Sequence, residues 1–162
     1  MYEHTIEVLN NYGRRVIDLY RSNLSNSGHN ATGKLSSTAS FNVEVSSEDI
    51  NVTIHLEDYY KYIEEGRRPG SFPPVDAILG WIQAKHIMPR EINGKLPTEQ
   101  QLAFLIGRKI AEQGIEGTHD LATAEETAKS EFEEAIREAL KQDYNEEALR
   151  YMQDAGLLTN LY

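Results

Sequence analysis

The stretch YYKYIEEGRRPGSFPPVDAILGWIQAKHI, residues 59–87, decides how this chain folds. A short aromatic-rich run stops at Gly66, and glycine is the residue most often found just past a helix end. Two arginines and a proline-rich turn follow, after which Pro73 and Pro74 suit the entry to another helix. The stretch therefore predicts two short helices joined by a stiff, locally basic elbow, residues 64–74.

The residues upstream of the elbow predict a long helix, a β-hairpin and a short helix. Apolar side chains recur every three or four positions over residues 3–24, which is the period of an amphipathic helix. Residues 41–45 and 50–56 alternate apolar and polar side chains, as strands with one buried face do. Only a short polar segment separates these two runs, so they are predicted to pair as a hairpin. Asp58 is the predicted N-cap of the short helix before the elbow.

The residues downstream of the elbow predict three more helices. The apolar stripe of the first is predicted to comprise Val75, Ile78, Leu79 and Ile82. Thr98 and Gln101 have the spacing of a capping box and open a helix that ends before Gly114. A second pair with this spacing, Thr123 and Glu126, predicts the start of a longer acidic helix. The apolar face of that helix is predicted to comprise Ala128, Phe132, Ala135, Ile136, Ala139 and Leu140.

These elements predict an α+β fold, in which an N-terminal helix and an antiparallel β-hairpin pack on three or four further helices. The chain has a length suited to a single domain, residues 1–162, with residues 143–162 as a C-terminal helical extension. A two-stranded hairpin alone is marginally stable in water. Its apolar face must therefore lie on the helices, or its edges must pair with further strands, which a neighbouring subunit could supply.

The composition restricts the classes of protein to which this chain can belong. It contains no cysteine, which excludes disulfides and thiolate metal sites and fits a reducing compartment. No apolar run approaches the ~18 residues of a membrane span, and the first residues lack the apolar core of a signal peptide. The chain is therefore expected to be made in the cytosol and to have no membrane partner.

The net charge of −10 is distributed unevenly along the chain. Residues 1–109 hold 12 basic and 13 acidic side chains, whereas residues 110–162 hold four basic and 13 acidic ones. Sequence-independent DNA binding relies on a cationic surface, so this balance argues against a general DNA-binding role. The first part of the chain could still carry a local basic patch.

No motif in the sequence predicts catalysis, a cofactor or a metal. No two of the five histidines lie three or four residues apart, the spacing of helical zinc sites, so they are interpreted as surface or loop residues. The sequence also lacks the phosphate-loop, dinucleotide-binding and nucleophile-elbow motifs. Adjacent acids, such as Glu64–Glu65 and Glu133–Glu134, lie on helices whose apolar face is elsewhere, so they are expected to face water.

The elbow and two aromatic residues are the strongest candidates for contact with another molecule. Arg67 and Arg68 are predicted to be exposed, and guanidinium groups bind carboxylates or phosphates through paired hydrogen bonds. The alternative is a rigid turn whose arginines are only solvated. Trp81 and Phe104 lie off the apolar stripes of their helices, which is typical of a second buried face or of an interface anchor.

Four short motifs follow one another between residues 32 and 122. They are Thr32-Gly33-Lys34-Leu35, then Tyr60, Tyr62, Ile63 and Glu64 with Gly66-Arg67-Arg68-Pro69, then Phe72-Pro73-Pro74 with Ile78, Trp81 and Ile82, and finally AFLIGRKIA, residues 103–111, with Gln113-Gly114-Ile115. In order and spacing they resemble the phage tail-completion or head–tail joining proteins of the minor tail protein Z-like group. The sequence departs from that family at residues 117–121, where a His-Pro-aromatic-Leu stretch is missing, and in an acidic tail that extends beyond Asp143.

The resemblance implies a structural, non-enzymatic virion protein without a cofactor. Members of this family are thought to form a homo-oligomeric ring around the DNA channel where the head meets the tail, beside portal, adaptor or tail proteins and without sequence-specific DNA binding. The protein would then lie in the virion neck after synthesis in the host bacterial cytoplasm. The residues expected at its interface are Arg67, Arg68, Pro69, Phe72, Trp81 and Phe104.

Two other functions stay open. A nucleic-acid-binding accessory protein would use Arg67, Arg68, Lys85 and Arg90, and DNA would retain it in a salt-dependent manner. A small enzyme would need a deep pocket that brings His55 or His86 beside a carboxylate.

Overall fold

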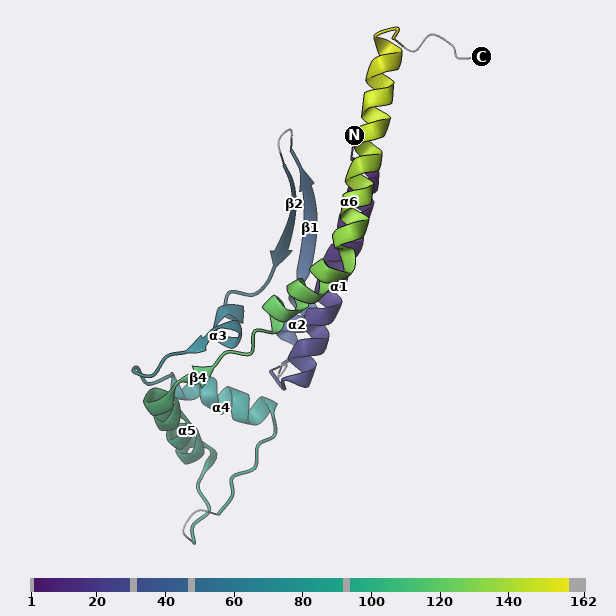
Figure 1. Cartoon of the computed structure of the whole chain (residues 1–162). Helices are drawn as coiled ribbons and strands as arrows, with labels where there is room; N and C mark the ends of the chain where they lie inside the picture. Colours follow the sequence, from purple (N-terminus) through teal and green to yellow (C-terminus); the bar gives the residue numbers. More distant parts are fainter. Residues whose placement is uncertain (1, 30–31, 47–48, 92–93, 158–162) are drawn as a thin grey trace. The chain divides into compact units, whose positions relative to one another are not determined.

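The computed structural model describes residues 2–29, 32–46, 49–91 and 94–157 and confirms the predicted α+β class. Figure 1 shows its helices and strands in chain order. The chain forms two compact units, neither of which is one continuous stretch. Unit 1 comprises Met1–Ser22, Ala39–His55 and Leu121–Tyr162, and unit 2 comprises Asn23–Thr38 and Leu56–Asp120. Organisation as a single domain stays a prediction.

Unit 1 combines two long helices with the predicted hairpin. Its elements are α1 (Glu3–Asn26, of which the last residues belong to unit 2), β1 (Ser40–Val45), β2 (Ile50–His55) and α6 (Asp120–Asp154). The strands pair antiparallel, so that Phe41 lies opposite Ile54 and Val43 opposite Val52. The apolar side chains therefore share one face of the hairpin, as the alternation predicts. Residues 47–48 of the predicted turn lie outside the described part of the chain.

A buried glycine allows the hairpin to approach α1. Gly13 lies in the middle of α1, and a Cβ atom placed on it would overlap the ring of Phe41 in β1. Any larger residue at this position would push the strand away from the helix. The contact gives the apolar face of the hairpin a place to pack within unit 1, although Val45 at the end of β1 stays 46% exposed.

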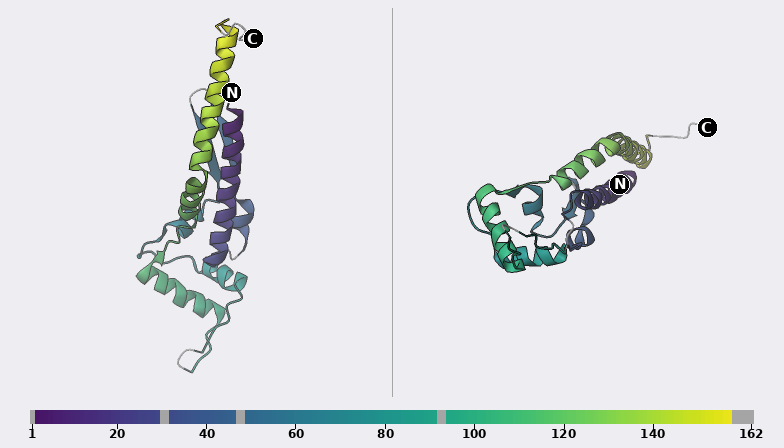
Figure 2. Two further views of the ribbon diagram at one scale, coloured as in Figure 1. Left: turned by 45° about the vertical axis from the view of Figure 1, so that its right-hand side comes forward. Right: turned by 90° about the horizontal axis from the view of Figure 1, so that it is seen from below.

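A stripe of small side chains holds α6 against α1, and the two helices lie side by side in Figures 1 and 2. Ala124, Ala128 and Ala139 are buried. The rings of Tyr12 and Phe132 meet edge to face, with their centroids 6.1 Å apart. The predicted face is wrong at two positions, because Ala135 and Leu140 are exposed.

The start of α6 also differs from the prediction. The helix begins at Asp120 and not at the pair Thr123 and Glu126. The Asp120 carboxylate, which is buried, accepts hydrogen bonds of 2.8 Å from the hydroxyls of Ser27 and Thr118. These bonds fix the chain ahead of the predicted cap, so the helix gains an extra turn that periodicity does not signal.

Unit 2 is built from short elements around a helical pair. They are α2 (Lys34–Thr38), α3 (Tyr60–Glu64), β3 (Gly66–Arg67), α4 (Val75–Ala84), α5 (Glu99–Gln113) and β4 (Ile115–Glu116). The predicted stripe of α4 packs against α5 in its core, which consists of Ile78, Ile82 and Ala103 with Val75, Leu79, Ile87, Leu102, Ile106 and Ile110 around them.

The caps of unit 2 confirm one prediction and contradict another. Thr98 and Gln101 form the predicted capping box, because each side chain accepts a hydrogen bond from the backbone N–H of the other. The predicted N-cap Asp58 is wrong, since α3 begins at Tyr60 and its N-cap residue, Tyr59, makes no side-chain capping bond. Among the described residues, no helix has both the length and the apolar character needed to cross a membrane.

Candidate interaction surface

The elbow of unit 2 is fastened to the chain that follows α5. Strand β3 pairs antiparallel with β4, which sets Gly66 opposite Glu116 and Arg67 opposite Ile115. Beyond this ladder, the Gly70 N–H donates to the Ala111 carbonyl across 2.8 Å. The elbow is therefore an ordered turn with backbone partners on both of its sides.

Glycines make this close crossing of the chain possible. Gly66 and Gly114 have φ angles of +77° and +76°, which residues with a Cβ atom adopt only at a cost. A Cβ atom on Gly66 would also overlap the Ile115 carbonyl oxygen, and one on Gly114 would overlap the carbonyl oxygen of Arg67. The predicted helix stop at Gly66 is confirmed, and its second role is to admit the neighbouring strand.

The two arginines of the elbow have different surroundings. Arg67 is partly buried, and its Nη2 atom donates to the carbonyl oxygen of Ser71 at 2.9 Å and to its hydroxyl at 3.3 Å. Arg68 is exposed and makes no hydrogen bond or ion pair with the described residues. Arg67 thus braces the elbow, whereas the guanidinium group of Arg68 is available to another molecule. Pro69 is exposed beside them and lies against Gly114.

Two of the predicted interface aromatics form a pair on the surface. The rings of Phe72 and Phe104 are tilted by 34°, with centroids 5.3 Å apart. Phe72 lies over Gly107 of α5, where a Cβ atom would overlap its ring. The two phenylalanines stay 41% and 53% exposed, respectively, so their mutual contact leaves much apolar surface open to water.

Trp81, which is 44% exposed, lines an apolar groove of about 380 Å³ that we call the Trp81 groove. The groove is lined by Tyr62, Ile63, Pro73, Ala77, Ile78, Trp81, Ile106, Ile110 and Ile115, with His29 and Glu116 as its polar members. A second hollow of about 550 Å³ shares His29, Ile63, Ala77 and Trp81 with it. The indole therefore stands between two adjoining hollows, which is a suitable place for an interface anchor.

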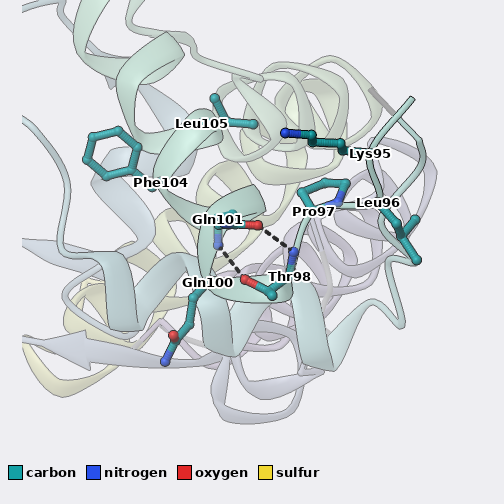
Figure 3. A pocket seen from close by; sticks show the side chains of 8 residues that line it. All are labelled: Lys95, Leu96, Pro97, Thr98, Gln100, Gln101, Phe104 and Leu105. Atoms are coloured by element: carbon teal, nitrogen blue, oxygen red, sulfur yellow. Dashed lines mark hydrogen bonds between the residues drawn. The ribbon is translucent and has the colours of Figure 1, made fainter. Parts of the chain in front are cut away.

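Another open hollow, of about 930 Å³, lies at the start of α5 and is drawn in Figure 3. Its described lining contains neither an acid nor a histidine, and the side chains of Thr98 and Gln101 are already used by the capping box. Phe104 and Leu105 supply apolar surface from α5, and Lys95 supplies a charge from the preceding loop. This hollow offers apolar and amide contacts but no pair of groups for acid–base chemistry.

Unit 1 contains a cluster of His4, Asp143 and Glu146. Among the described residues, these three have potential ligand atoms close enough to one another to hold a metal ion. The Asp143 carboxylate is buried and accepts hydrogen bonds from the backbone N–H groups of His4 and Thr5, at 3.1 and 2.8 Å, and from the Thr5 hydroxyl at 2.6 Å. These N–H groups belong to the first turn of α1, where helices lack internal partners. Asp143 therefore caps α1 from a distant position in the chain.

The pKa shifts in this cluster follow from the capping bonds. Burial alone would raise the pKa of the Asp143 carboxyl, but the bonds from Thr5 and His4 outweigh it and hold that pKa well below its usual range. The hydrogen bond between His4 Nδ1 and Asp143, 2.9 Å long, raises the pKa of the imidazole. Both Asp143 oxygens accept hydrogen bonds from the first turn of α1, so the cluster is explained as a structural cap of that helix.

The sequence reasoning missed part of the apolar surface. Tyr62 and Ile115 are 67% and 44% exposed and both line the Trp81 groove. The aromatic-rich run before the elbow could have identified Tyr62. Ile115 belongs to a two-residue strand, flanked by Gly114 and Gly117, that is too short to show a period. His55 and His86, the histidines considered for a catalytic pocket, line none of the three hollows of unit 2.

Comparison with models of known protein families, with curated proteins and with solved structures finds no match to this chain. The assignment of a function therefore rests on the residues and on their arrangement.

Proposed function

We propose that this chain is a structural assembly protein of a tailed-bacteriophage neck, which forms a homo-oligomeric ring around the DNA channel between head and tail. The observation that carries the proposal is the exposed apolar surface of unit 2, where the Trp81 groove and the Phe72–Phe104 pair accompany an ordered elbow. The order of the motifs in residues 32–122 supports this family in particular.

The physical argument concerns the cost of leaving such a surface in water. Large contiguous apolar patches are rare on soluble monomers and mark interaction sites. Aromatic and arginine side chains dominate the binding energy of most protein interfaces, and Trp81, Phe104 and Arg68 supply both types. Backbone bonds that hold the elbow in place reduce the conformational entropy lost on docking. Neighbouring subunits, and portal, adaptor or tail proteins, are the proposed partners.

A non-enzymatic role is part of the proposal. The hollows of unit 2 are lined mainly by apolar, amide and hydroxyl side chains, and the acidic, basic and imidazole side chains among their described residues are His29, Lys34, Lys95 and Glu116. The hydrogen bond to Glu57 raises the pKa of Lys34, which keeps its amine protonated and unsuited to act as a base. The alternative, a nucleic-acid-binding accessory protein, has less support because Arg67 is engaged within the elbow.

The molecular mass in solution tests the proposal. We expect the purified protein to assemble, alone or with the neck proteins of the same genome, into closed rings that light scattering and negative-stain electron microscopy detect. Deletion of the gene from the phage genome should leave filled heads and tails unjoined. Particles that join and infect normally without the protein would overturn the proposal.

A matched pair of variants connects assembly to the proposed surface. Trp81→Ser should weaken assembly because it removes an anchor that is 44% exposed in the free chain. Met88→Ser is the control, because Met88 is also apolar, is 80% exposed and lines none of the three hollows of unit 2. Equal assembly of the two variants would show that exposed apolar area as such, and not the groove, drives any association.

A further inference from the structure

The apolar side of α6 changes between its two halves. Ala124, Ala128 and Ala139 are buried on the side that packs in unit 1, and Asp143 continues this row beside the first turn of α1. A second row, which we call the distal stripe, comprises Leu140, Tyr144, Ala148, Tyr151 and Met152. At ~100° per residue the distal stripe is rotated on average by roughly 140° from the first row. Tyr144, Ala148 and Tyr151 therefore point away from α1, whereas Leu140 still lines a hollow with Thr5 and Leu9 of α1.

The distal stripe is exposed over most of its length. Tyr144 and Tyr151 are 75% and 76% exposed, and Leu140 and Met152 are 42% and 44% exposed. The other side of the helix here is mostly charged, with Leu149 as an exposed apolar exception: Glu146 lies 3.9 Å from His4, and Arg150 pairs with Glu147 at 3.5 Å. α6 continues for roughly 16 Å beyond Asp143, at 1.5 Å per residue, and passes the start of α1 (Figure 1). The chain therefore carries a projecting amphipathic helix end.

We infer that the distal stripe of one copy of this chain docks into the Trp81 groove of the next copy. The inference deepens the proposed function, on which it rests, by naming the two surfaces of the subunit contact. Tyr144, Ala148 and Tyr151 have the i, i+4, i+7 spacing with which amphipathic helices fill apolar grooves. The stripe and the groove are two different surfaces of the chain, as a head-to-tail contact requires.

The charges favour this pairing over contact between two distal stripes. Unit 1 holds 16 acidic and seven basic side chains, a net charge of −9, whereas unit 2 holds 10 acidic and nine basic ones, a net charge of −1. Pairing of two α6 helices would place two strongly acidic units together, and like charges across an interface are costly. In the groove contact the acids of the helix end instead meet the nearly neutral unit 2. There Arg68 follows the strand partner of the groove residue Ile115, and Glu116 is the one acid among the described lining residues of the groove.

Head-to-tail docking of identical subunits has a geometric consequence. Each copy then offers one groove and one helix end, so contacts repeat until the rotation closes into a ring. The inference thus supplies a contact of the type that a neck ring needs. It also predicts that a copy with only one working surface can join a chain but cannot extend it.

A mixing experiment tests the inference. Tyr151→Glu places a charge in the distal stripe, and Ala77→Glu places one at an exposed position of the groove. We expect either variant alone to self-associate roughly tenfold or more weakly than the parent. An equal mixture of the two should form a dimer that grows no further, since one intact groove meets one intact helix end. Gln153→Glu and Gln100→Glu are the controls, because they add the same charge to exposed positions of α6 and α5 outside both surfaces.

The absence of cysteine from the sequence allows a second measurement with folded protein. Chains carrying Tyr151→Cys and chains carrying Ala77→Cys should form a disulfide-linked heterodimer when they are mixed and oxidised. Linkage of Tyr151→Cys chains to each other in preference to Ala77→Cys chains would overturn the inference in favour of paired α6 helices. Assembly of either glutamate variant at the parent level would also overturn it, and would leave the proposed function standing. A parent protein that never assembles would instead contradict the proposed function itself.

Discussion

At the scale of single residues, Asp143 connects two parts of the chain that lie far apart in the sequence. Its carboxylate accepts three hydrogen bonds from His4 and Thr5 and a fourth contact from the imidazole of His4. Charge-assisted hydrogen bonds at the start of a helix also interact favourably with the helix dipole. One buried side chain in α6 therefore determines where α1 begins.

The pKa shifts of this cap predict a pH dependence of stability. Because the Asp143 pKa is lowered in the folded state, its contribution is present above about pH 4 and is lost as the pH falls. Because the His4 pKa is raised, its contribution is present below about pH 6.5 and is lost as the pH rises through the raised value. The free energy of unfolding, measured with urea, should therefore be highest between these limits.

Substitution identifies the residue responsible for the acid side of this profile. Asp143→Asn should lower the free energy of unfolding by about 1–3 kcal/mol at neutral pH and should flatten its fall in acid. Glu126→Gln, at an exposed position of the same helix, should leave the profile unchanged. An unaltered acid limb in Asp143→Asn would mean that other carboxyl groups cause the loss of stability.

The glycine at the elbow makes a second prediction at this scale. Gly66→Ala should destabilise unit 2 by about 1–3 kcal/mol or more, because the φ of +77° is costly for alanine and the new Cβ would overlap the Ile115 carbonyl. Gly80→Ala is the matched control, since Gly80 lies in α4 with open space around it. This variant should be more stable than the parent protein by up to about 1 kcal/mol. Urea unfolding of both variants gives the comparison, and equal stabilities would contradict the assigned crossing of β3 and β4.

At the scale of elements, the alanine row of α6 makes a prediction about packing. Ala128 is fully buried, whereas Ala135, in the same helix, is exposed. Ala128→Leu should lower the free energy of unfolding by about 1–3 kcal/mol because the added carbons have no space against α1. Ala135→Leu adds the same atoms at the surface and should change stability by less than about 0.5 kcal/mol. Thermal unfolding distinguishes the two, and a neutral Ala128→Leu would mean that α6 does not pack through this row.

Period and capping chemistry explain which elements the sequence could predict. The apolar residues of the hairpin, α1, α4 and α5 repeat with a regular period along each element, and Thr98 and Gln101 form a capping box within four residues. Such signals lie within a short stretch of sequence and can be recognised there. The start of α6 depends on Ser27, which is remote in sequence from Asp120. The two-residue strands β3 and β4 are too short to carry a period. The start of α6 and the strands β3 and β4 thus depend on contacts between residues that are distant in sequence, and local propensity does not predict them.

The candidate interaction surface was predictable to a similar extent. Trp81 and Phe104 stood out because an aromatic side chain off the apolar stripe of a helix has no place in that helix's core contact. The distal stripe does not stand out in the sequence, because the apolar period predicts a single apolar face for α6 that includes Leu140. The structure reveals that the apolar residues of α6 change sides along the helix, because Ala139 is buried whereas its neighbour Leu140 is exposed.

At the scale of the whole molecule, the uneven charge divides the chain by unit. Unit 1 carries nearly all of the net charge of −10, and unit 2 is close to neutral. An acidic protein beside a DNA channel repels the phosphate backbone and does not retain passing DNA. The charge distribution therefore favours the proposed conduit over the alternative of a nucleic-acid-binding protein.

The last prediction is that this protein does not bind duplex DNA at physiological salt. Phosphate contacts need clustered free cations, and of the two elbow arginines only Arg68 lacks a partner among the described residues. Fluorescence anisotropy of a labelled duplex should stay at the value of free DNA when the protein is added, and Arg68→Ala should leave it unchanged. Because affinity for DNA rises steeply as salt falls, the titration is repeated at low ionic strength, where any weak contact is most visible. Binding that decreases with salt and disappears in Arg68→Ala would establish the nucleic-acid-binding alternative and would contradict a passive wall around the channel.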